Sequence, residues 1–479
     1  RRLVFKKADL LLAAKTSFGK SVIFQATPLF CRGGIAIIII PLDRIGKEQC
    51  IKIRRLPGAT PVFVNGKTDK TAQLAYEIET GVYTHIIMGP EIAAGWFQSI
   101  ARNPSFKKRV SVVAIDELHL VALWGNGIRP QYAQLSLFRR RLGRSIPWFG
   151  CSATLDQKTL SIARKMTGFH NECEFFRSSV DRPEILLIVE TIQPRTTRSF
   201  TSVFFVLTDA MTDGLPTLEK IPKTIIFIDS RRDIQRCADS LRNWLKRLSG
   251  GAITDSQARQ LIQVYHSHTA ESDKNSIYAE FSKMDSKIRI MVATESLGTG
   301  VDLSDVVRVV QYGFPLDRLL SVLIQRFGRA ARLPDIKGEA IFMVESWAVG
   351  DRTVPTRRAI VSNGQIVSSS LLPSSTSRLS QMQAAEAERD ISDNESDIAV
   401  DETELAGPTD DRRKRKSDRE RRTDLYNDSP ALFDFVNRSS CLRRILMSWL
   451  EESMADPATQ LPPPHPGECC NVCNTTLAR

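Results

Sequence analysis

The sequence predicts an α/β protein with two tandem domains, each built on a mostly parallel sheet covered by helices, followed by a small helical C-terminal segment. Its 479 residues exceed the roughly 250–300 residues that one hydrophobic core supports, so two or more domains are expected. Apolar runs of strand length alternate with helical stretches in two separate series, which is typical of parallel sheets covered by helices. Four of the nine cysteines gather near the C-terminus, which indicates a distinct segment there.

The first series is assigned to a domain at residues 1–180. It opens with an apolar strand after Asp9, then a loop and a helix start. The run at 110–115 is apolar and β-branched, as expected for a central strand that is buried on both faces. Further strands are expected at 34–41, 60–65, 85–90 and 148–154, and helices at 42–56 and 70–80.

The second series is assigned to a domain at residues 181–346. The proline and polar residues of 178–183 indicate the junction between the two domains. Strands are expected at 223–230, 261–267, 287–294, 306–313 and 338–345, with helices ending near Arg247, spanning 270–284 and ending near Arg332. Two comparable domains in tandem leave a cleft between them.

Residues 347–425 are expected to be a disordered, charged linker, because their composition shifts to Ser, Arg, Asp and Glu with few aromatic residues. The basic block at 412–422 is a nuclear localisation signal or nucleic-acid tether by one interpretation, and a solvated charged linker or helix by another. Apolar periodicity returns in the last segment, 426–479.

The balance of charge indicates the kind of partner. There are 66 Lys and Arg residues against 54 Asp and Glu residues, a net charge of +12, which favours a polyanion such as nucleic acid over a membrane surface. The longest apolar runs have only strand length, so no membrane-spanning segment and no membrane partner are expected. The chain begins with Arg1 and shows no signal peptide, so it is expected to be a fragment that starts inside a domain.

A phosphate-binding loop is predicted at Ala14–Ser21, which fits the pattern [AG]-x4-G-K-[ST] between a strand and a helix. In such a loop, backbone N–H groups and the helix N-terminus bind phosphates. Lys20 is expected to reach the β- and γ-phosphates, and Ser21 to ligate Mg²⁺.

An acidic pair follows the expected strand at 110–115. Asp116 and Glu117 would lie at the carboxyl end of that strand, where open α/β sheets bind ligands. Given a phosphate loop, Asp116 can hold Mg²⁺ through water and Glu117 can polarise an attacking water. The alternative is that the pair only caps the following helix.

The cysteine pattern favours a reducing compartment and one metal site over a disulfide framework. Cys470 and Cys473 have the C-x2-C spacing that suits tetrahedral Zn²⁺, while Cys469 is adjacent to Cys470 rather than three residues away. His465 is a possible substitute ligand, and free cysteines in a flexible tail are the alternative.

The sequence resembles the RecQ family of superfamily 2 DNA helicases when four motifs are taken together. These are the phosphate loop, the DELH box at 116–119, the SAT triplet at 152–154 and the arginine pair in QRFGRAAR at 325–332. The resemblance runs from Leu10 to about Val344 and resumes at Cys441. It also includes the aromatic-rich stretch HLVALWGNGIRPQY and the stretch ATESLGTGVDLSDV. The resemblance implies two RecA-like P-loop domains and a zinc-binding segment.

The resemblance also implies roles for individual residues. The catalytic candidates are Glu117, Asp116, Arg329, Arg332 and Gln325, and the candidates for binding ATP and Mg²⁺ are Thr16, Gly19, Lys20, Ser21, Asp116, Gly300 and Asp302. The candidates for DNA binding or coupling are His119, Trp124, Arg129, Tyr132, Ser152, Thr154 and Thr294, with Ala153 inside the same triplet. The Zn²⁺ candidates are Cys441, Cys469, Cys470 and Cys473.

Three departures from the family pattern bear on activity. Ser17 and Phe18 replace glycines of the phosphate loop, where backbone freedom can be required. Asn126–Ile128 replace the usual His, Asp and Phe of the aromatic-rich stretch, which removes one base-stacking platform. Ala331 replaces the last glycine of the arginine motif. Weaker nucleotide affinity and weaker DNA-stimulated ATPase activity are therefore expected.

Three functional hypotheses follow. The first is an ATP- and Mg²⁺-dependent 3′-to-5′ DNA helicase or translocase of RecQ type that acts on single-stranded or branched DNA in the nucleus. The second is a catalytically impaired, helicase-derived nucleic-acid-binding protein. The third is an ATPase that acts on protein partners, and the Trp124 loop and the arginine motif disfavour it.

Overall fold

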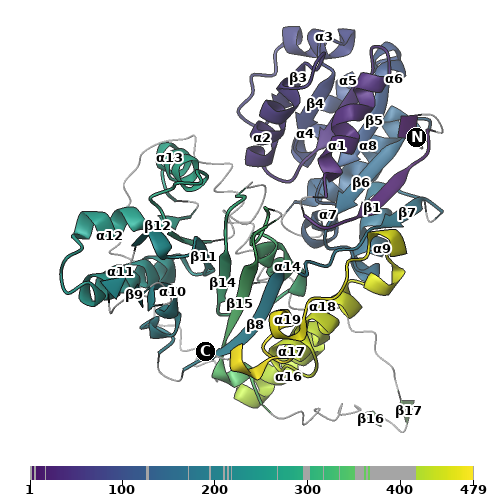
Figure 1. The fold of residues 1–479 in the computed structure, drawn as a ribbon. Helices are drawn as coiled ribbons and strands as arrows, with labels where there is room; N and C mark the ends of the chain where they lie inside the picture. Colours follow the sequence, from purple (N-terminus) through teal and green to yellow (C-terminus); the bar gives the residue numbers. More distant parts are fainter. Residues whose placement is uncertain are drawn as a thin grey trace, which may run out of the picture.

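The computed structural model confirms two α/β domains with parallel sheets and helices on both faces (Figure 1). The structure describes residues 3–4, 7–16, 18–125, 129–170, 172–193, 196–208, 211–212, 215–216, 218–266, 268–294, 303–316, 318–333, 335–350, 361–362, 365–366 and 417–477. Among these residues, no helix is long and apolar enough to cross a membrane.

The N-terminal sheet has seven parallel strands in the order β3-β4-β2-β5-β6-β1-β7. Strand β2, the third in this order, is buried along its whole length, because helices cover both faces and leave no strand face to water. The strands are β1 (Leu10–Ala13), β2 (Ile35–Ile39), β3 (Pro61–Val64), β4 (His85–Met88), β5 (Val110–Ile115), β6 (Trp148–Ser152) and β7 (Glu174–Arg177).

The helices of this domain bury separate apolar clusters on the two faces of the sheet. The helices are α1 (Lys20–Ala26), α2 (Asp43–Arg54), α3 (Ala72–Thr80), α4 (Pro90–Ala94), α5 (Phe97–Ile100), α6 (Pro104–Arg109), α7 (His119–Trp124), α8 (Leu135–Leu142) and α9 (Gln157–Thr167). The expected helices at 42–56 and 70–80 correspond to α2 and α3.

The second sheet has six parallel strands in the order β12-β13-β11-β14-β15-β8. The strands are β8 (Ile185–Ile192), β11 (Thr224–Phe227), β12 (Ile262–Tyr265), β13 (Ile290–Ala293), β14 (Arg308–Tyr312) and β15 (Gly338–Glu345), and the helices are α10 (Phe205–Thr208), α11 (Arg231–Leu248), α12 (Asp255–Leu261), α13 (Glu271–Phe281) and α14 (Leu320–Phe327). Strand β8 was not among the expected elements. It follows the junction directly and pairs along its length with β15, the last strand of the domain.

The helix that was expected to continue to Arg332 ends at Phe327 instead. Gly328 is its C-cap, and Ala331 has a positive φ of 51°, a conformation that an α-helix cannot contain. The arginine motif therefore begins on α14 and ends in the loop that follows.

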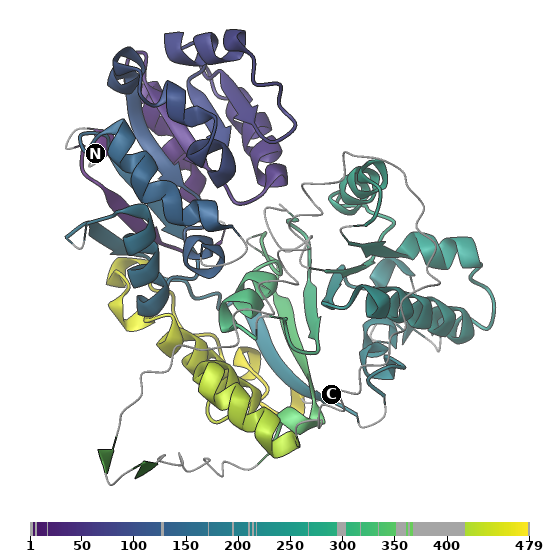
Figure 2. The ribbon, with the colours of Figure 1, turned by 180° about the vertical axis from the view of Figure 1, so that it is seen from behind.

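The C-terminal segment consists of α16 (Asp418–Asp428), α17 (Pro430–Val436), α18 (Leu442–Trp449) and α19 (Pro466–Cys469). Its apolar residues belong to the same buried cluster as one face of the second sheet. In Figure 2 the segment runs along the second domain and reaches the N-terminal domain. Helix α16 occupies the end of the range expected to be a disordered linker. It starts there because Ser417 and Glu420 form a capping box.

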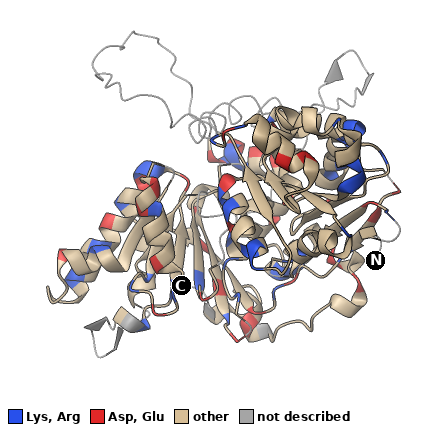
Figure 3. Ribbon diagram, turned by 90° about the horizontal axis from the view of Figure 1, so that it is seen from above, with Lys and Arg blue, Asp and Glu red and all other residues tan. Residues whose placement is uncertain are grey.

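Charged residues are spread over the helices of both domains, with basic and acidic positions interspersed (Figure 3). The net positive charge of the sequence is thus not gathered on one element of the described chain.

Candidate active site

Three neighbouring strands of the N-terminal sheet bring the candidate residues to one edge. Strands β5, β6 and β1 are adjacent and parallel, so their carboxyl ends meet. The acidic pair follows β5, the SAT triplet begins at the last residue of β6, and the phosphate loop follows β1. The sheet register alone therefore assembles these three motifs.

The phosphate loop has the backbone geometry that its sequence predicts where it is described. Gly19 is the N-cap of α1, with φ 85° and ψ 21°, a left-handed conformation that glycine adopts without strain. The Lys20 ammonium donates hydrogen bonds of 3.0 Å to the carbonyl oxygens of Ala14 and Lys15. The Ser21 hydroxyl accepts a hydrogen bond of 3.2 Å from Gln49. Ser17 lies outside the described residues.

Asp116 is buried at the end of β5. Its Oδ1 accepts hydrogen bonds from the Glu117 backbone N–H at 3.0 Å and from the Cys151 thiol at 3.4 Å. Burial, and then the charge of Glu117, raises the pKa of Asp116 to about 6, against the opposing effect of Lys20. A buried carboxylate of this kind gains most from a nearby cation, which fits the proposed Mg²⁺ role.

Glu117 adopts a left-handed backbone conformation with φ 51°, which is strained for a residue with a side chain. The alternative role, helix capping, is wrong for α7, because its N-cap is Leu118 and no side chain caps it. Glu117 Oε2 instead lies 3.3 Å from His119 Nδ1.

His119 connects the acidic box to both the SAT triplet and the second domain. Its Nδ1 lies 2.7 Å from Ser152 Oγ, and its Nε2 contacts the side-chain amide of Gln325 on α14. Gln325 also donates to Thr154 Oγ1 at 3.3 Å. Burial lowers the pKa of His119, so the ring is neutral at pH 7. It can then accept from Gln325 at Nε2 and donate from Nδ1.

The arginine motif contributes three arginines with different surroundings. Arg329 is buried, and Arg332 Nε donates to the Gly328 carbonyl at 3.3 Å. Arg326 points into its own domain, where it pairs with Asp229 at 2.7 Å. Arg329 and Arg332 therefore remain the arginine candidates, and Arg326 has a structural role.

The aromatic-rich segment is partly surface and partly core. The Arg129 guanidinium lies 5.3 Å from the centre of the Trp124 ring, contacts the Pro41 carbonyl and lies 3.6 Å from Glu91. Tyr132 is only 1% exposed and packs within the apolar cluster of the N-terminal domain. Tyr132 is thus unable to contact DNA directly in this arrangement, so of the two roles expected for its group, DNA binding or coupling, only coupling stays a prediction for this residue. Asn126–Ile128 lie outside the described residues.

The second-domain glycine motif is only partly described. Thr294 follows β13, is 9% exposed and donates its backbone N–H to the Tyr265 carbonyl at 3.2 Å. Gly300 and Asp302 lie outside the described residues, so their roles stay predictions.

Two residues that sequence reasoning did not select border the site. The Cys151 thiol supports Asp116, and Arg182 contacts both the phosphate loop and the arginine motif. In the sequence, Cys151 is one cysteine within an apolar strand, and Arg182 is one polar residue of the domain junction at 178–183, so neither carries a signal of its own.

The four C-terminal cysteines come together. Their sulfur atoms all lie within 4.8 Å of one another, with Cys441 to Cys469 at 3.6 Å, Cys441 to Cys470 at 3.9 Å and Cys470 to Cys473 at 3.6 Å. Thiolates around a tetrahedral Zn²⁺ with bonds of about 2.3 Å stand about 3.8 Å apart. The four residues therefore fit a tetrahedral zinc site, and the adjacency of Cys469 and Cys470 does not prevent it.

Comparison with known proteins identifies the two α/β domains. Residues 2–162 match the DEAD/DEAH box helicase family, and residues 206–334 match the helicase conserved C-terminal domain. Among solved structures, the DUF1998 helicase MrfA bound to DNA and AMPPNP has a TM-score of 0.54 at 16% identity and covers 72% of this chain and 47% of its own. Mss116p bound to ssRNA and AMP-PNP has a TM-score of 0.54 at 20% identity, covering 71% of this chain and 67% of its own. These structures share the fold.

Curated relatives add the family. The ATP-dependent DNA helicase RecQ of Haemophilus influenzae is 26% identical over 341 residues, covering 70% of this chain and 48% of its own length. A protein of Acanthamoeba polyphaga mimivirus that is named an ATP-dependent RNA helicase is 26% identical over 331 residues, covering 69% of this chain and 54% of its own length. The chain thus spans about half the length of these relatives. From the two domain matches and the RecQ relatives, the chain is a RecQ-like member of the superfamily 2 helicases.

Proposed function

We propose that the protein is an ATP-dependent helicase or translocase that moves 3′-to-5′ on DNA, as RecQ-type enzymes do. The observation that carries this proposal is the polar cluster of Glu117, His119, Ser152, Thr154 and Gln325. It joins the acidic box of one domain to a helix of the other through direct contacts. Relative motion of the domains must therefore change the surroundings of the proposed catalytic carboxylate.

The residues on the two sides of this cluster have separate roles in turnover. Lys20 exchanges its bonds to the loop carbonyls for phosphate oxygens. Ser21 and Asp116 would hold Mg²⁺, which would neutralise charge at the phosphates. Glu117 orients the attacking water and accepts its proton. Arg329 and Arg332 approach the phosphates when the domains close, and separation of the domains withdraws them.

DNA is the proposed substrate because the RecQ relatives are named DNA helicases and the chain carries a net charge of +12. RNA is the competing substrate, since one relative is named an RNA helicase. In the C-terminal segment, we propose that the four cysteines hold Zn²⁺ and thereby fix that segment against the second sheet.

A second candidate is a helicase-derived protein that binds nucleic acid without turnover. The observation that favours it is Phe18, which takes the place of a phosphate-loop glycine in the RecQ pattern and is 46% exposed beside Gly19. A bulky side chain at this position can restrict the approach of a phosphate to the backbone.

ATP turnover of the full chain, measured alone and with single-stranded DNA or RNA of matched length, tests both proposals. The first predicts turnover that DNA stimulates more than RNA does. Strand displacement on duplexes with a 3′ or a 5′ overhang then tests direction. No turnover and no binding of a fluorescent ATP analogue at micromolar concentration, in a protein that still binds the same nucleic acids, would support the second candidate instead.

A further inference from the structure

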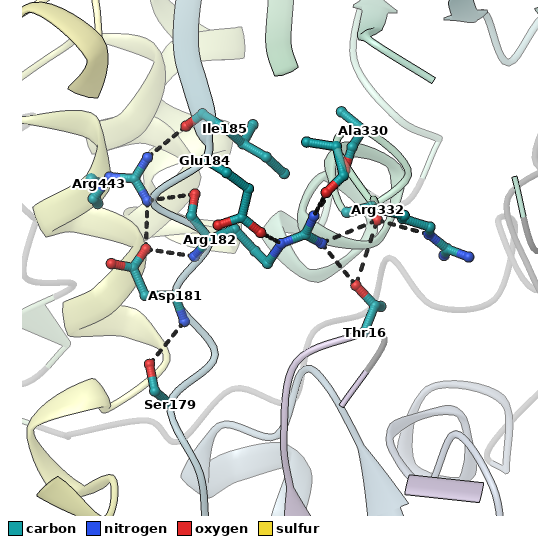
Figure 4. Close-up of polar contacts among 11 residues, drawn as sticks. Thr16, Ser179, Asp181, Arg182, Glu184, Ile185, Ala330, Arg332 and Arg443 are labelled. Atoms are coloured by element: carbon teal, nitrogen blue, oxygen red, sulfur yellow. Dashed lines mark hydrogen bonds and ion pairs between the residues drawn. The ribbon is translucent and has the colours of Figure 1, made fainter. Parts of the chain in front are cut away.

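The segment that joins the two domains carries an arginine that contacts both sides of the nucleotide cleft. Arg182 precedes β8, and its side chain is 12% exposed. Its Nη1 donates to Thr16 Oγ1 of the phosphate loop at 3.2 Å and to the Gly328 carbonyl at 3.4 Å. Its Nη2 donates to the carbonyls of Ala330 at 2.9 Å and Ala331 at 2.7 Å. Figure 4 shows the guanidinium between the two segments.

These contacts have a physical reason on the side of the second domain. Helix α14 ends at Phe327, and the carbonyls beyond it have no partner within the helix. They lie next to the C-terminus of α14, the negative end of its dipole, where a cation is stabilised. The planar guanidinium can serve several of these carbonyls at once, because its N–H groups form a rigid fork. Arg182 thus orders the loop that carries Arg329 and Arg332.

The same guanidinium ties this loop to the phosphate loop. Thr16 Oγ1 lies 3.2 Å from Arg182 and 3.5 Å from the Gly328 carbonyl. Thr16 and the Gly328–Ala331 loop belong to different domains and meet at this guanidinium. A shift of Arg182 therefore changes the distance between the phosphate loop and the arginine motif.

The C-terminal segment holds Arg182 from the opposite side. Arg443 of α18 forms an ion pair with Asp181 and donates to the backbone carbonyls of Arg182, at 3.0 Å, and Ile185. Arg443 lies two positions after Cys441, the N-cap of α18 and a member of the cysteine cluster. The backbone that carries Arg182 is thus fixed to the cysteine segment.

We infer that Arg182 is a positioning residue that sets the alignment of the phosphate loop with the arginine motif, and that Arg443 holds it in place from the cysteine segment. The part of this inference that concerns turnover rests on the proposed ATPase function. The part that concerns loop order holds without nucleotide.

The test uses the full chain with Arg182→Ala, Arg182→Lys and Arg443→Ala. Arg177→Ala is the matched control, because Arg177 is also buried and binds the carbonyls of Leu155 and Leu450 between the N-terminal domain and the C-terminal segment. Within the described part of the chain, its side chain contacts neither the phosphate loop nor the arginine motif. Hydrogen–deuterium exchange of the peptide 328–333 without nucleotide reports loop order, and steady-state kinetics reports turnover.

For Arg182→Ala, we expect faster exchange of this peptide and a kcat that falls roughly 10- to 100-fold, with little change in the KM for ATP, because alignment rather than nucleotide binding is lost. Arg182→Lys should recover only part of the kcat, since an ammonium lacks the planar fork. Arg443→Ala should change both quantities in the same direction by less, and Arg177→Ala should change neither.

Guanidinium ion at a non-denaturing concentration should restore turnover to Arg182→Ala and leave Arg177→Ala unaffected. A cavity of about 50 Å³ already borders Arg182, Thr16 and Gly328, and the substitution enlarges it. Wild-type exchange or wild-type kcat in folded Arg182→Ala overturns the inference. If that variant does not fold, Arg182→Lys decides by the same two readings. Absence of turnover in the unsubstituted protein overturns the proposed function, and the exchange comparison then still decides the role of Arg182.

Discussion

The two halves of the candidate site are built in different ways. In the N-terminal half, the acidic box, the SAT triplet and the phosphate loop follow three adjacent parallel strands, so the register of one sheet fixes their positions. In the C-terminal half, Gln325 lies on α14 and the arginine loop follows it. Side-chain contacts hold these residues instead of sheet register: His119 contacts Gln325, and Arg182 binds carbonyls of the arginine loop.

The difference indicates where chemistry and regulation reside. The N-terminal half is preorganised and supplies the carboxylates, whereas the C-terminal half depends on contacts that domain movement can make or break. Loss of a carboxylate of the first half should abolish turnover. Loss of a contact between the halves, such as that between His119 and Gln325, should alter the dependence of turnover on nucleic acid.

The largest expected effect comes from Glu117→Gln. Removing the proton acceptor while keeping the side-chain volume should lower the kcat for ATP about 10²- to 10⁴-fold and leave nucleotide binding intact. Single-turnover hydrolysis and equilibrium binding of a fluorescent analogue measure the two quantities. Unchanged hydrolysis would show that another group activates water.

A stability change tests the internal support of the second domain. Asp229→Ala leaves the buried Arg326 without the carboxylate that lies 2.7 Å away and removes the acceptor of the Leu316 N–H at 2.8 Å. Leaving such a charge uncompensated should lower the free energy of unfolding by about 3–5 kcal/mol. Arg259→Ala, which breaks an exposed pair with Asp255, should have no resolvable effect in the same urea titration. Equal effects would contradict a structural role for Arg326.

The metal content tests the C-terminal segment. We expect about one zinc per chain in the purified protein and close to none in Cys470→Ser, because the cluster then loses one of four thiolates. Its thermal midpoint should also fall, since the segment shares the core of the second sheet. Cys31→Ser, outside the cluster, should keep its metal. The zinc site would be refuted if the purified wild-type protein held no metal and Cys470→Ser had the same thermal midpoint as the wild-type protein.

A smaller effect concerns the pH dependence of the N-terminal domain. Burial lowers the pKa of His85, whose Nε2 lies 2.8 Å from the Gln25 carbonyl. As the pH falls through about 6.5, His85 therefore becomes protonated in the unfolded chain before it does in the folded protein. This preference lowers the free energy of unfolding at acidic pH. The raised pKa of Asp116, about 6, acts in the opposite direction. Only the comparison with His85→Gln therefore isolates the histidine.

Between about pH 7 and pH 5, wild-type protein should lose more stability than His85→Gln, because only the wild-type chain carries a histidine whose pKa is lowered by folding. Denaturant unfolding at both pH values measures this difference. Parallel pH profiles would show that His85 is equally protonated in the folded and unfolded chain.

Sequence reasoning predicted the N-terminal half well because its motifs follow strands directly. It was less successful where position depends on distant contacts. Strand β8 pairs with the far end of its domain, and Tyr132 lies in a segment with aromatic and basic residues but its ring is buried in the core. Arg182 looks like an ordinary solvated arginine until the fold brings Thr16 and Ala330 to it.

The most direct test of the account is a double-mutant cycle between His119 and Gln325, the contact that joins the two halves. DNA-stimulated ATP turnover is measured for His119→Ala, Gln325→Ala, the double variant and the unsubstituted protein. We predict that each single change removes most of the stimulation and that the double change adds little, which corresponds to a coupling of about 0.5–3 kcal/mol. Fully additive effects would contradict the claim that this contact couples the domains.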